Sequence, residues 1–398
     1  LDSGIDPNHP DIRRNVDRDL SRNFTRDIPS IGSPCRDERD RSCDDPHLGD
    51  PAGHGTAVAS MVAAPLNDTG ISGVAPNVTL VSLRVGQESG FIFVQPVVDA
   101  LTYAADNAID IANLSFWIDP WWLNCPSNPA DSPEAQQDQQ TTIAAVQAAV
   151  DYARGRGVTI VVPTANDWTD LDNPMTDTLS PTFPLDSSTE REVDDTCLLL
   201  PVEADGVIGV SGVGPSGRKA FYSNYGLDAT DVAAPSGDDF DDTLQYPSNL
   251  VLAAFPKAPL RRFGLLDRDG RPTIPEVMRQ CSGRRCSYYV FIGGTSFAGP
   301  TAAGVAALIV SAHGSDDGAG GVTMAPAAVE RILYETARPH ACPEGGVQEY
   351  PEIGDKLVEF GLPSWEAFTA TCTEGPGQTN GFFGHGLVNA YDAVTYRP

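Results

Sequence analysis

An aspartate, a histidine and a serine, far apart in the chain, each lie beside glycines and have the side chains needed for nucleophilic catalysis. Asp2 precedes a Ser-Gly pair, His54 lies between two glycines, and Ser296 follows the run Gly-Gly-Thr. A serine hydroxyl becomes a strong nucleophile when an imidazole accepts its proton, and a carboxylate must fix the tautomer of that imidazole and stabilise its charge. This ordered set therefore predicts acyl-transfer chemistry at a serine.

The local sequence distinguishes these positions from ordinary turn or surface residues. His54 lies in the pattern Gly-His-Gly-Thr-x-Val-Ala, which none of the other histidines has. Ser296 lies in Gly-Thr-Ser-x-Ala-x-Pro at the start of a helical pattern, where free backbone N–H groups and the helix dipole stabilise an anion. Because Asp-Ser-Gly alone is common in turns, the assignment of Asp2 depends on the other two segments.

The three motifs, in the order Asp, His, Ser, resemble the subtilisin-like serine proteases, or subtilases, from Leu1 to about Val394. The resemblance implies an α/β protein with a three-layer subtilisin-like fold, in which a mostly parallel central sheet has helices on both faces. It also implies a peptidase in which Asp2 orients His54 and His54 activates Ser296 to form an acyl-enzyme. That chemistry requires no cofactor.

A further oxyanion donor is expected directly after a buried strand, where Asn166 follows an apolar run. The simpler interpretation of Asn166 is a turn residue. The family usually has Ala-Gly-Asn here, so Ala165 stands in place of a glycine. This alanine either constrains the backbone or narrows the floor of the first specificity pocket.

A second departure lies in Ile-Ala-Asn-Leu-Ser-Phe-Trp, which resembles the family strand that pairs with an extended substrate. The family usually has glycine where Trp117 stands. This tryptophan either narrows the cleft or belongs to an inserted loop, where the aromatic cluster anchors the loop or forms a subsite wall. We therefore predict altered specificity. With Ala165, the predicted substrate-binding residues are Asn113, Leu114, Ser115, Phe116 and Trp117.

Short apolar runs alternate with helical patterns, which indicates a parallel sheet covered on both faces. Buried strands are predicted at 78–85, 109–116, 158–163, 207–213 and 250–254. Helices are predicted at 56–64, 94–107, 141–156, 296–312, 325–336 and 388–395. We expect a single subtilisin-like peptidase domain over 1–398 that lacks its upstream N-terminal strand, with insertions near 21–50, 117–140, 167–197 and 258–287.

Charge limits the choice of partners. The chain has 54 acidic and 26 basic residues, a net charge of −28, so nucleic acid and anionic membrane surfaces would repel it. No uninterrupted apolar run reaches the roughly 18 residues that span a bilayer. The predicted partners are protein or peptide substrates and, by resemblance, an N-terminal propeptide in the full-length chain. A monomer is expected.

The eight cysteines favour disulfides over metal or redox sites, because no Cys-x-x-Cys and no complete Cys/His ligand set occurs. Secretion, or another extracytoplasmic location, follows; reduced thiols in a cytosolic enzyme are the alternative. Eight cysteines allow 105 pairings. Pairing between neighbours would close each loop without crossing the core, which predicts Cys35–Cys43, Cys125–Cys197, Cys281–Cys286 and Cys342–Cys372.

Two questions stay open. The loop at 66–76 matches a segment that binds calcium in some subtilases, but Asn67 and Asp68 alone do not define a site that needs about six to eight oxygens. A structural calcium is therefore left open. The alternative function is a catalytically impaired subtilase-like domain that only binds peptides, motivated by Trp117 and Ala165. The retained triad favours the enzyme, and labelling of Ser296 by a fluorophosphonate separates the two.

Overall fold

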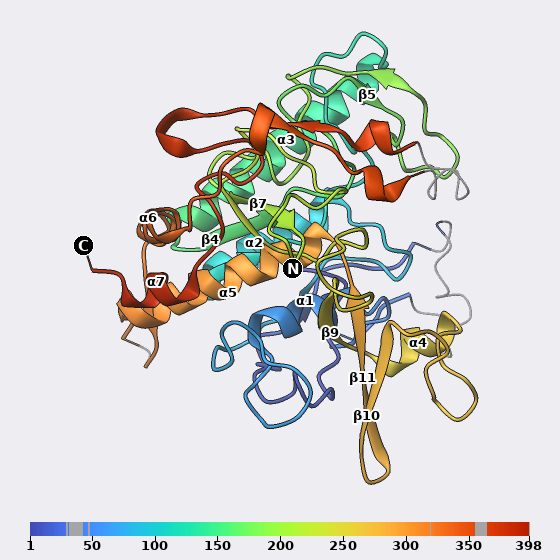
Figure 1. The fold of residues 1–398 in the computed structure, drawn as a ribbon, viewed down its shortest axis with the longest axis vertical. Coiled ribbons are helices and arrows are strands. Elements are labelled where there is room, and N and C mark those ends of the chain that lie inside the picture. The colour runs from blue at the N-terminus through green and yellow to red at the C-terminus, as the bar shows by residue number, and fades with distance from the viewer. Residues whose placement is uncertain (29–30, 32–42, 47, 319, 355–363, 398) are drawn as a thin grey trace.

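The computed structural model describes residues 1–28, 31, 43–46, 48–318, 320–354 and 364–397 (Figure 1). Its central sheet has four parallel strands in the order β3-β4-β7-β8. The strands are β3 (Ile111–Asn113), β4 (Thr159–Pro163), β7 (Ile208–Val213) and β8 (Val232–Pro235). Every residue of β4 and β7 is buried, as expected for parallel strands that are covered on both faces.

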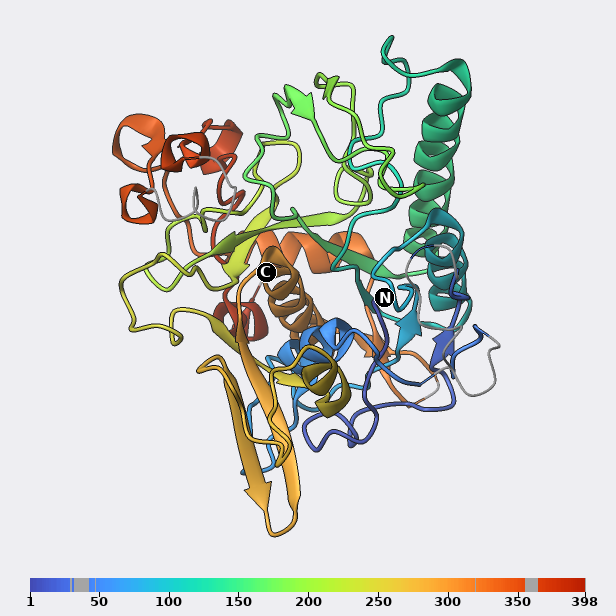
Figure 2. The ribbon, with the colours of Figure 1, turned by 90° about the vertical axis from the view of Figure 1, so that its right-hand side faces the viewer.

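Helices pack on both faces of this sheet (Figures 1 and 2). One face has α2 (Val94–Asp106) and α3 (Pro133–Gly155), and the other has α5 (Thr295–His313), α6 (Pro326–Thr336) and α7 (Ala390–Thr395). Side chains alternate along β4, so that Ile160 and Val162 join the first core while Val161 joins the second. The three-layer α/β fold predicted from the sequence is confirmed.

Helix α5 is the central core helix. It packs against α1 (His54–Ala63) as well as against the sheet. By length and composition it is the one helix in the described part of the chain that could cross a membrane, but 67% of its apolar window is buried inside the protein. Its small residues permit this close packing: a Cβ on Gly304 would lie 2.6 Å from Val74 Cβ.

The strand predicted at 78–85 is much shorter in the structure. Only Leu83–Arg84 forms a strand, β2, which pairs in parallel with β1 (Arg22–Asn23). Before it, the Ser21 hydroxyl accepts the Ser82 N–H at 3.1 Å. A side chain thus takes the place of a backbone acceptor and interrupts the ladder.

The predicted loop at 258–287 is largely regular structure. It contains helix α4 (Lys257–Arg262) and most of the hairpin β10 (Val277–Ser282) and β11 (Arg285–Ile292). The predicted strand at 250–254 is β9 (Val251–Phe255), but it pairs antiparallel with β11 outside the parallel sheet. The outer part of the hairpin, residues 278–285, projects into solvent (Figure 1), so it lacks the apolar pattern of a buried strand.

Helix α3 begins eight residues earlier than predicted, inside the expected insertion 117–140. Ser132 caps it by accepting the Ala135 N–H, and Pro133 occupies the first turn. The first two turns contain four glutamines, one of them buried, so the apolar spacing appears only later in the helix. Each of the remaining strands has two residues. They are β5 (Thr176–Asp177), β6 (Arg191–Glu192), β12 (Ser315–Asp316), β13 (Val322–Thr323), β14 (Val347–Gln348) and β15 (Ala370–Thr371).

Three of the four predicted disulfides are confirmed. They join Cys125 to Cys197, Cys281 to Cys286, and Cys342 to Cys372. The predicted pairing of Cys35 with Cys43 involves Cys35, which lies outside the described residues.

Candidate active site

Asp2 and His54 lie in direct contact. Asp2 is held beside β2 because Val85 N–H donates to the Asp2 carbonyl at 2.9 Å. His54 is the first residue of α1, and its Nδ1 lies 2.8 Å from Asp2 Oδ1. A carboxylate at Nδ1 assigns the proton to that nitrogen, which leaves Nε2 free to accept a proton from a nucleophile.

The two partners shift each other's pKa. Burial opposes the charged imidazolium, but the adjacent Asp2 carboxylate outweighs it and raises the pKa of His54 above its ordinary 6.5. Burial also opposes the charged carboxylate, yet His54 and the Ser3 N–H lower the pKa of Asp2. The pair thus stabilises the ion pair that a proton transfer to His54 would create.

A buried aspartate, Asp50, joins the segments that carry Asp2 and His54. Its side chain accepts the Ser3 hydroxyl at 2.8 Å, and it accepts the N–H groups of Gly53 and Thr56 at 2.7 Å each. Sequence reasoning missed this residue within the predicted insertion 21–50. The available signal was an acidic residue just before a helix, the place where a carboxylate caps free N–H groups.

Ser296 lies at the first turn of α5, half-buried. Gly294, with φ of 142°, caps the helix, and its N–H donates to the Tyr222 hydroxyl at 2.8 Å. The ring of Phe297, the next residue, lies 6.0 Å from the His54 ring, which brings α1 and α5 together at this point. Ser296 therefore lies at a helix N-terminus, one residue before a ring that lies 6.0 Å from the His54 ring.

The amide of Asn166 is oriented by Thr295. Asn166 Oδ1 accepts both the Thr295 N–H at 2.8 Å and the Thr295 hydroxyl at 3.0 Å. Its NH₂ group is then available to donate beside Ser296. Ala165 has φ of 71°, in the left-handed region that disfavours a Cβ, so the alanine occupies a backbone conformation suited to the usual glycine.

A pocket of about 460 Å³ opens beside Ser296 and Asn166. Its lining includes Ser115, Phe116, Trp117 and Ala165, which the sequence predicted, together with Phe91 and Thr182, which it did not. The other two predicted substrate-binding residues, Asn113 and Leu114, lie outside this lining. Leu114 is fully buried in the core, and Asn113 Nδ2 donates to the Ser115 hydroxyl at 2.8 Å.

Three aromatic residues, Phe91, Phe116 and Trp117, belong to the lining of this pocket. Phe91 stacks on Phe93 with centroids 5.9 Å apart, and Phe183 contacts both rings edge-on. Asp119 also lines the pocket, but its two oxygens accept the Ile92 N–H and the Thr182 hydroxyl, at 2.7 and 2.6 Å. The pocket therefore suits an apolar side chain.

The tryptophan cluster divides between two roles. Trp117 faces the pocket, whereas Trp121 and Trp122 are buried and donate to Asp138 and Asp167. These two hold the inserted segment in place.

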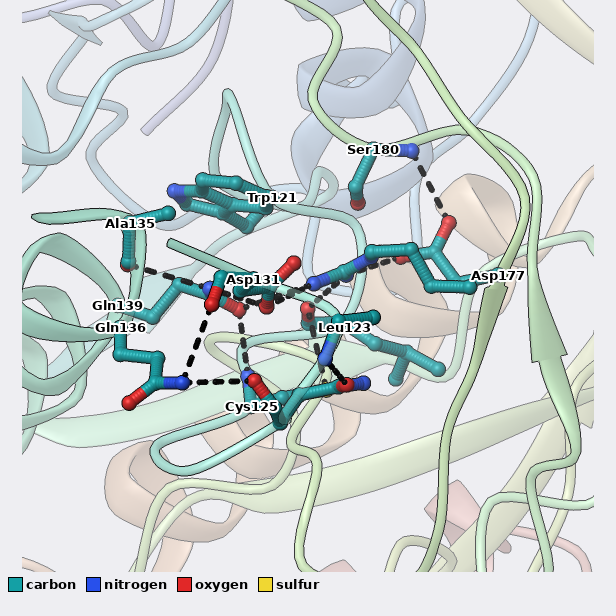
Figure 3. A network of polar contacts seen from close by, with 12 residues as sticks. Trp121, Leu123, Cys125, Asp131, Ala135, Gln136, Gln139, Asp177 and Ser180 are labelled. Atoms are coloured by element: carbon teal, nitrogen blue, oxygen red, sulfur yellow. Dashed lines mark hydrogen bonds and ion pairs between the residues drawn. The ribbon is translucent and has the colours of Figure 1, made fainter. Parts of the chain in front are cut away.

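Buried Arg191 links the segments 117–140 and 167–197. It is 3% exposed and donates to Asp131 at 2.7 Å, to Asp177 at 2.5 Å and to the Leu123 carbonyl at 2.8 Å. The Gln139 side chain extends this network between Asp131 and the Cys125 N–H, as Figure 3 shows. The nearby Cys125–Cys197 disulfide adds a covalent link.

The loop proposed for calcium is closed by protein donors. Asn67 Oδ1 accepts the N–H and hydroxyl of Thr69, at 3.0 and 2.7 Å, while Asn67 Nδ2 donates to Asp11. Over the described residues, no cluster of three or more His, Cys, Asp or Glu could hold a metal ion. Of the two candidate ligands, Asn67 is therefore already bonded within its own loop.

The chain belongs to the Subtilase family, whose profile matches residues 1–386. This confirms the resemblance predicted from the three motifs, and it defines the class as a subtilisin-like serine peptidase, whose chemistry needs no cofactor.

Individual relatives are distant. A thermophilic serine proteinase of Bacillus sp. (strain AK1) is 27% identical over 312 residues, which cover 78% of this chain and 51% of the relative. Subtilisin DY of Bacillus licheniformis is 26% identical over 261 residues, which cover 66% of this chain and 64% of the relative. The chain thus spans about half to two-thirds of the length of these relatives. The solved structure of a lanthipeptide protease matches with a TM-score of 0.60 and 20% identity. The match covers 99% of this chain and 85% of that protein, and it supports the fold alone.

Proposed function

We propose that this chain is a serine endopeptidase domain, spanning 1–398, whose catalytic residues are Asp2, His54 and Ser296. The observation that carries the proposal is the 2.8 Å contact between Asp2 and His54 Nδ1, together with a serine at the N-terminus of α5, the helix that packs against α1. That contact provides a general base with a fixed tautomer, which serine needs in order to react.

In the proposed reaction, Ser296 Oγ attacks the peptide carbonyl carbon while His54 Nε2 takes the hydroxyl proton. The oxyanion is held by the Asn166 amide and the Ser296 N–H. His54 then gives the proton to the leaving amine as the C–N bond breaks, which leaves an acyl-enzyme. Water, deprotonated by His54, attacks the ester and releases the acid together with free Ser296.

The pocket defines the proposed preference on the acyl side. Phe91, Phe116 and Trp117 present aromatic surface, and the oxygens of Asp119 are already occupied. We propose that substrate peptides place an apolar side chain there and that specificity is narrower than that of a broad protease. The similar lanthipeptide protease acts, by its name, on one class of peptides.

The described disulfides support an oxidising, extracytoplasmic location for the domain. We further propose that it works as a monomer and that a propeptide precedes it in the full-length chain. Calcium is not required in this proposal.

Hydrolysis of fluorogenic peptides with an apolar acyl-side residue tests the function. Purified complete chain should cleave them, Ser296→Ala should lose activity, and Asp2→Asn should lose about 10⁴-fold in kcat because the histidine tautomer is no longer fixed. Binding of the same peptides without cleavage would favour the peptide-binding alternative instead.

A further inference from the structure

One segment reverses the charge of the protein. Residues 257–285, which we call the basic arm, contain eight Arg or Lys and three Asp or Glu, a net charge of +5. The rest of the chain has 18 basic and 51 acidic residues, a net charge of −33. The arm comprises helix α4, the strand β10 and the turn that leads into β11.

Most of the arginines in the arm have no acidic partner among the described residues. Arg262 pairs with Glu88, and Arg271 lies 3.7 Å from Asp269 with both side chains largely exposed. The other arginines that are exposed and form no ion pair with any described residue are Arg261, Arg268, Arg279, Arg284 and Arg285. Although the protein is rich in carboxylates, none of the described ones pairs with these exposed guanidinium groups. The groups are therefore available to an external carboxylate.

The arm is held in a fixed shape. Six residue pairs join β10 to β11, and the Cys281–Cys286 disulfide closes the tip. At the base, the Tyr288 hydroxyl donates to the Gly270 carbonyl at 2.9 Å. The outer edge of β10 also lacks a strand partner among the described residues. The β10–β11 hairpin of the arm projects from the body of the protein, as Figure 1 shows. These links therefore fix the position from which the arm presents its charge.

The arm begins beside His54. Arg262 of α4 donates to the Pro51 carbonyl at 2.8 Å, three residues before His54. The Phe255 ring packs so closely on Gly53 that a Cβ there would lie 2.3 Å from it. At its other end β11 leads directly into the segment that carries Ser296.

The leaving chain must pass this region. Because His54 returns its proton to the leaving amine, the departing half of the substrate lies against His54. The apolar pocket lies on the other side, next to Asn166, and receives the acyl half. The arm thus flanks the path of the leaving half.

We propose that the basic arm binds acidic residues on the leaving-group side of the substrate, so that the preferred substrate is a polypeptide with Asp or Glu several residues after the cleaved bond. This inference rests on the proposed peptidase function. The ordinary role of charged residues on an edge strand is to prevent strand pairing between molecules, and that role would give no preference among substrates.

The test compares peptides that share one acyl half and differ only in a leaving half rich in Asp and Glu, in Ser and Gly, or in Lys. In 50 mM salt we expect kcat/KM for the acidic peptide to exceed that for the neutral one by about fivefold, since exposed Arg–carboxylate pairs are individually weak. The ratio should fall toward one in 0.5 M salt. In the triple variant Arg261→Ser/Arg284→Ser/Arg285→Ser, the ratio of kcat/KM for the acidic peptide to that for the neutral one should fall to below about twofold.

The matched control removes three exposed arginines elsewhere, Arg156→Ser, Arg331→Ser and Arg397→Ser, and should keep the parent ratio. Anisotropy titrations of labelled acidic and neutral peptides on Ser296→Ala measure the same preference without cleavage. If the acidic peptide binds better but nothing is hydrolysed, the peptidase proposal fails and the arm's role stands. Equal ratios in parent and arm variant, or concentration-dependent self-association that depends on the arm, would overturn the inference.

Discussion

The segments on the two sides of the cleft hold their arginines in opposite ways. On the pocket side, the segments 117–140 and 167–197 bury Arg191 between two carboxylates and are joined by a disulfide whose cysteines are 72 residues apart. On the His54 side, the basic arm leaves its arginines exposed, and its disulfide joins residues only 5 apart.

The difference separates charges that hold the structure from charges that can meet a partner. A buried guanidinium must have all its partners within the fold, because an unpaired buried charge is costly. An exposed guanidinium contributes little to stability, so its clustering in an otherwise acidic protein is explained better by recognition. The predictions below test that contrast.

The largest effect on stability is expected at Arg191. Arg191→Met should lower the free energy of unfolding by about 3–5 kcal/mol, because Asp131 and Asp177 would stay buried without a cation. Arg284→Ser in the arm should change it by less than about 0.5 kcal/mol. Urea denaturation of both variants measures the contrast, and similar losses would contradict it.

The Cys125–Cys197 disulfide should contribute more to stability than the Cys281–Cys286 disulfide of the arm. Replacing Cys125 and Cys197 with serine should cost about 4 kcal/mol, because the bridge closes a long loop, whereas replacing Cys281 and Cys286 should cost about 2 kcal/mol. Thermal unfolding of each double variant tests the order. A larger loss from the Cys281–Cys286 pair would show that the tip is part of the core's stability.

A small gain is expected from Ala165→Gly. Because Ala165 has φ of 71°, glycine should stabilise the fold by about 1 kcal/mol and widen the pocket floor. Chemical denaturation gives the first quantity, and kcat/KM for bulkier acyl-side residues gives the second. Loss of stability would mean that the alanine methyl group makes contacts worth more than the backbone strain.

The site could be predicted because its residues lie in short motifs. Contacts between segments that are far apart in the sequence could not be predicted. Short motifs around His54 and Ser296 identified the family, and the glycine-to-alanine change marked Ala165, which has a positive φ in the structure. The role of Asp50 depends on Ser3 and Thr56, which only the fold brings together. Phe183 contacts Phe91 of the pocket lining from a segment whose path no motif encodes.

The arm shows a second limit. Residues 277–292 form a hairpin that is exposed at its tip, and exposed strands lose the apolar alternation that periodicity detects. The sequence therefore predicts a loop where the structure has an antiparallel pair. Its excess of arginine was visible in the sequence, but its place beside His54 was not.

The central claim is that Asp2 and His54 activate Ser296. The most direct measurement is the rate at which a fluorophosphonate labels the complete chain as a function of pH, with the adduct located by peptide mass. The account predicts an adduct on Ser296 whose rate rises with pH through a midpoint above 6.5, since Asp2 raises the pKa of His54 and only neutral His54 can accept the proton. Asp2→Asn should lower the rate by about 10⁴-fold. No adduct on Ser296, or a rate independent of pH and unchanged in Asp2→Asn, would contradict the account.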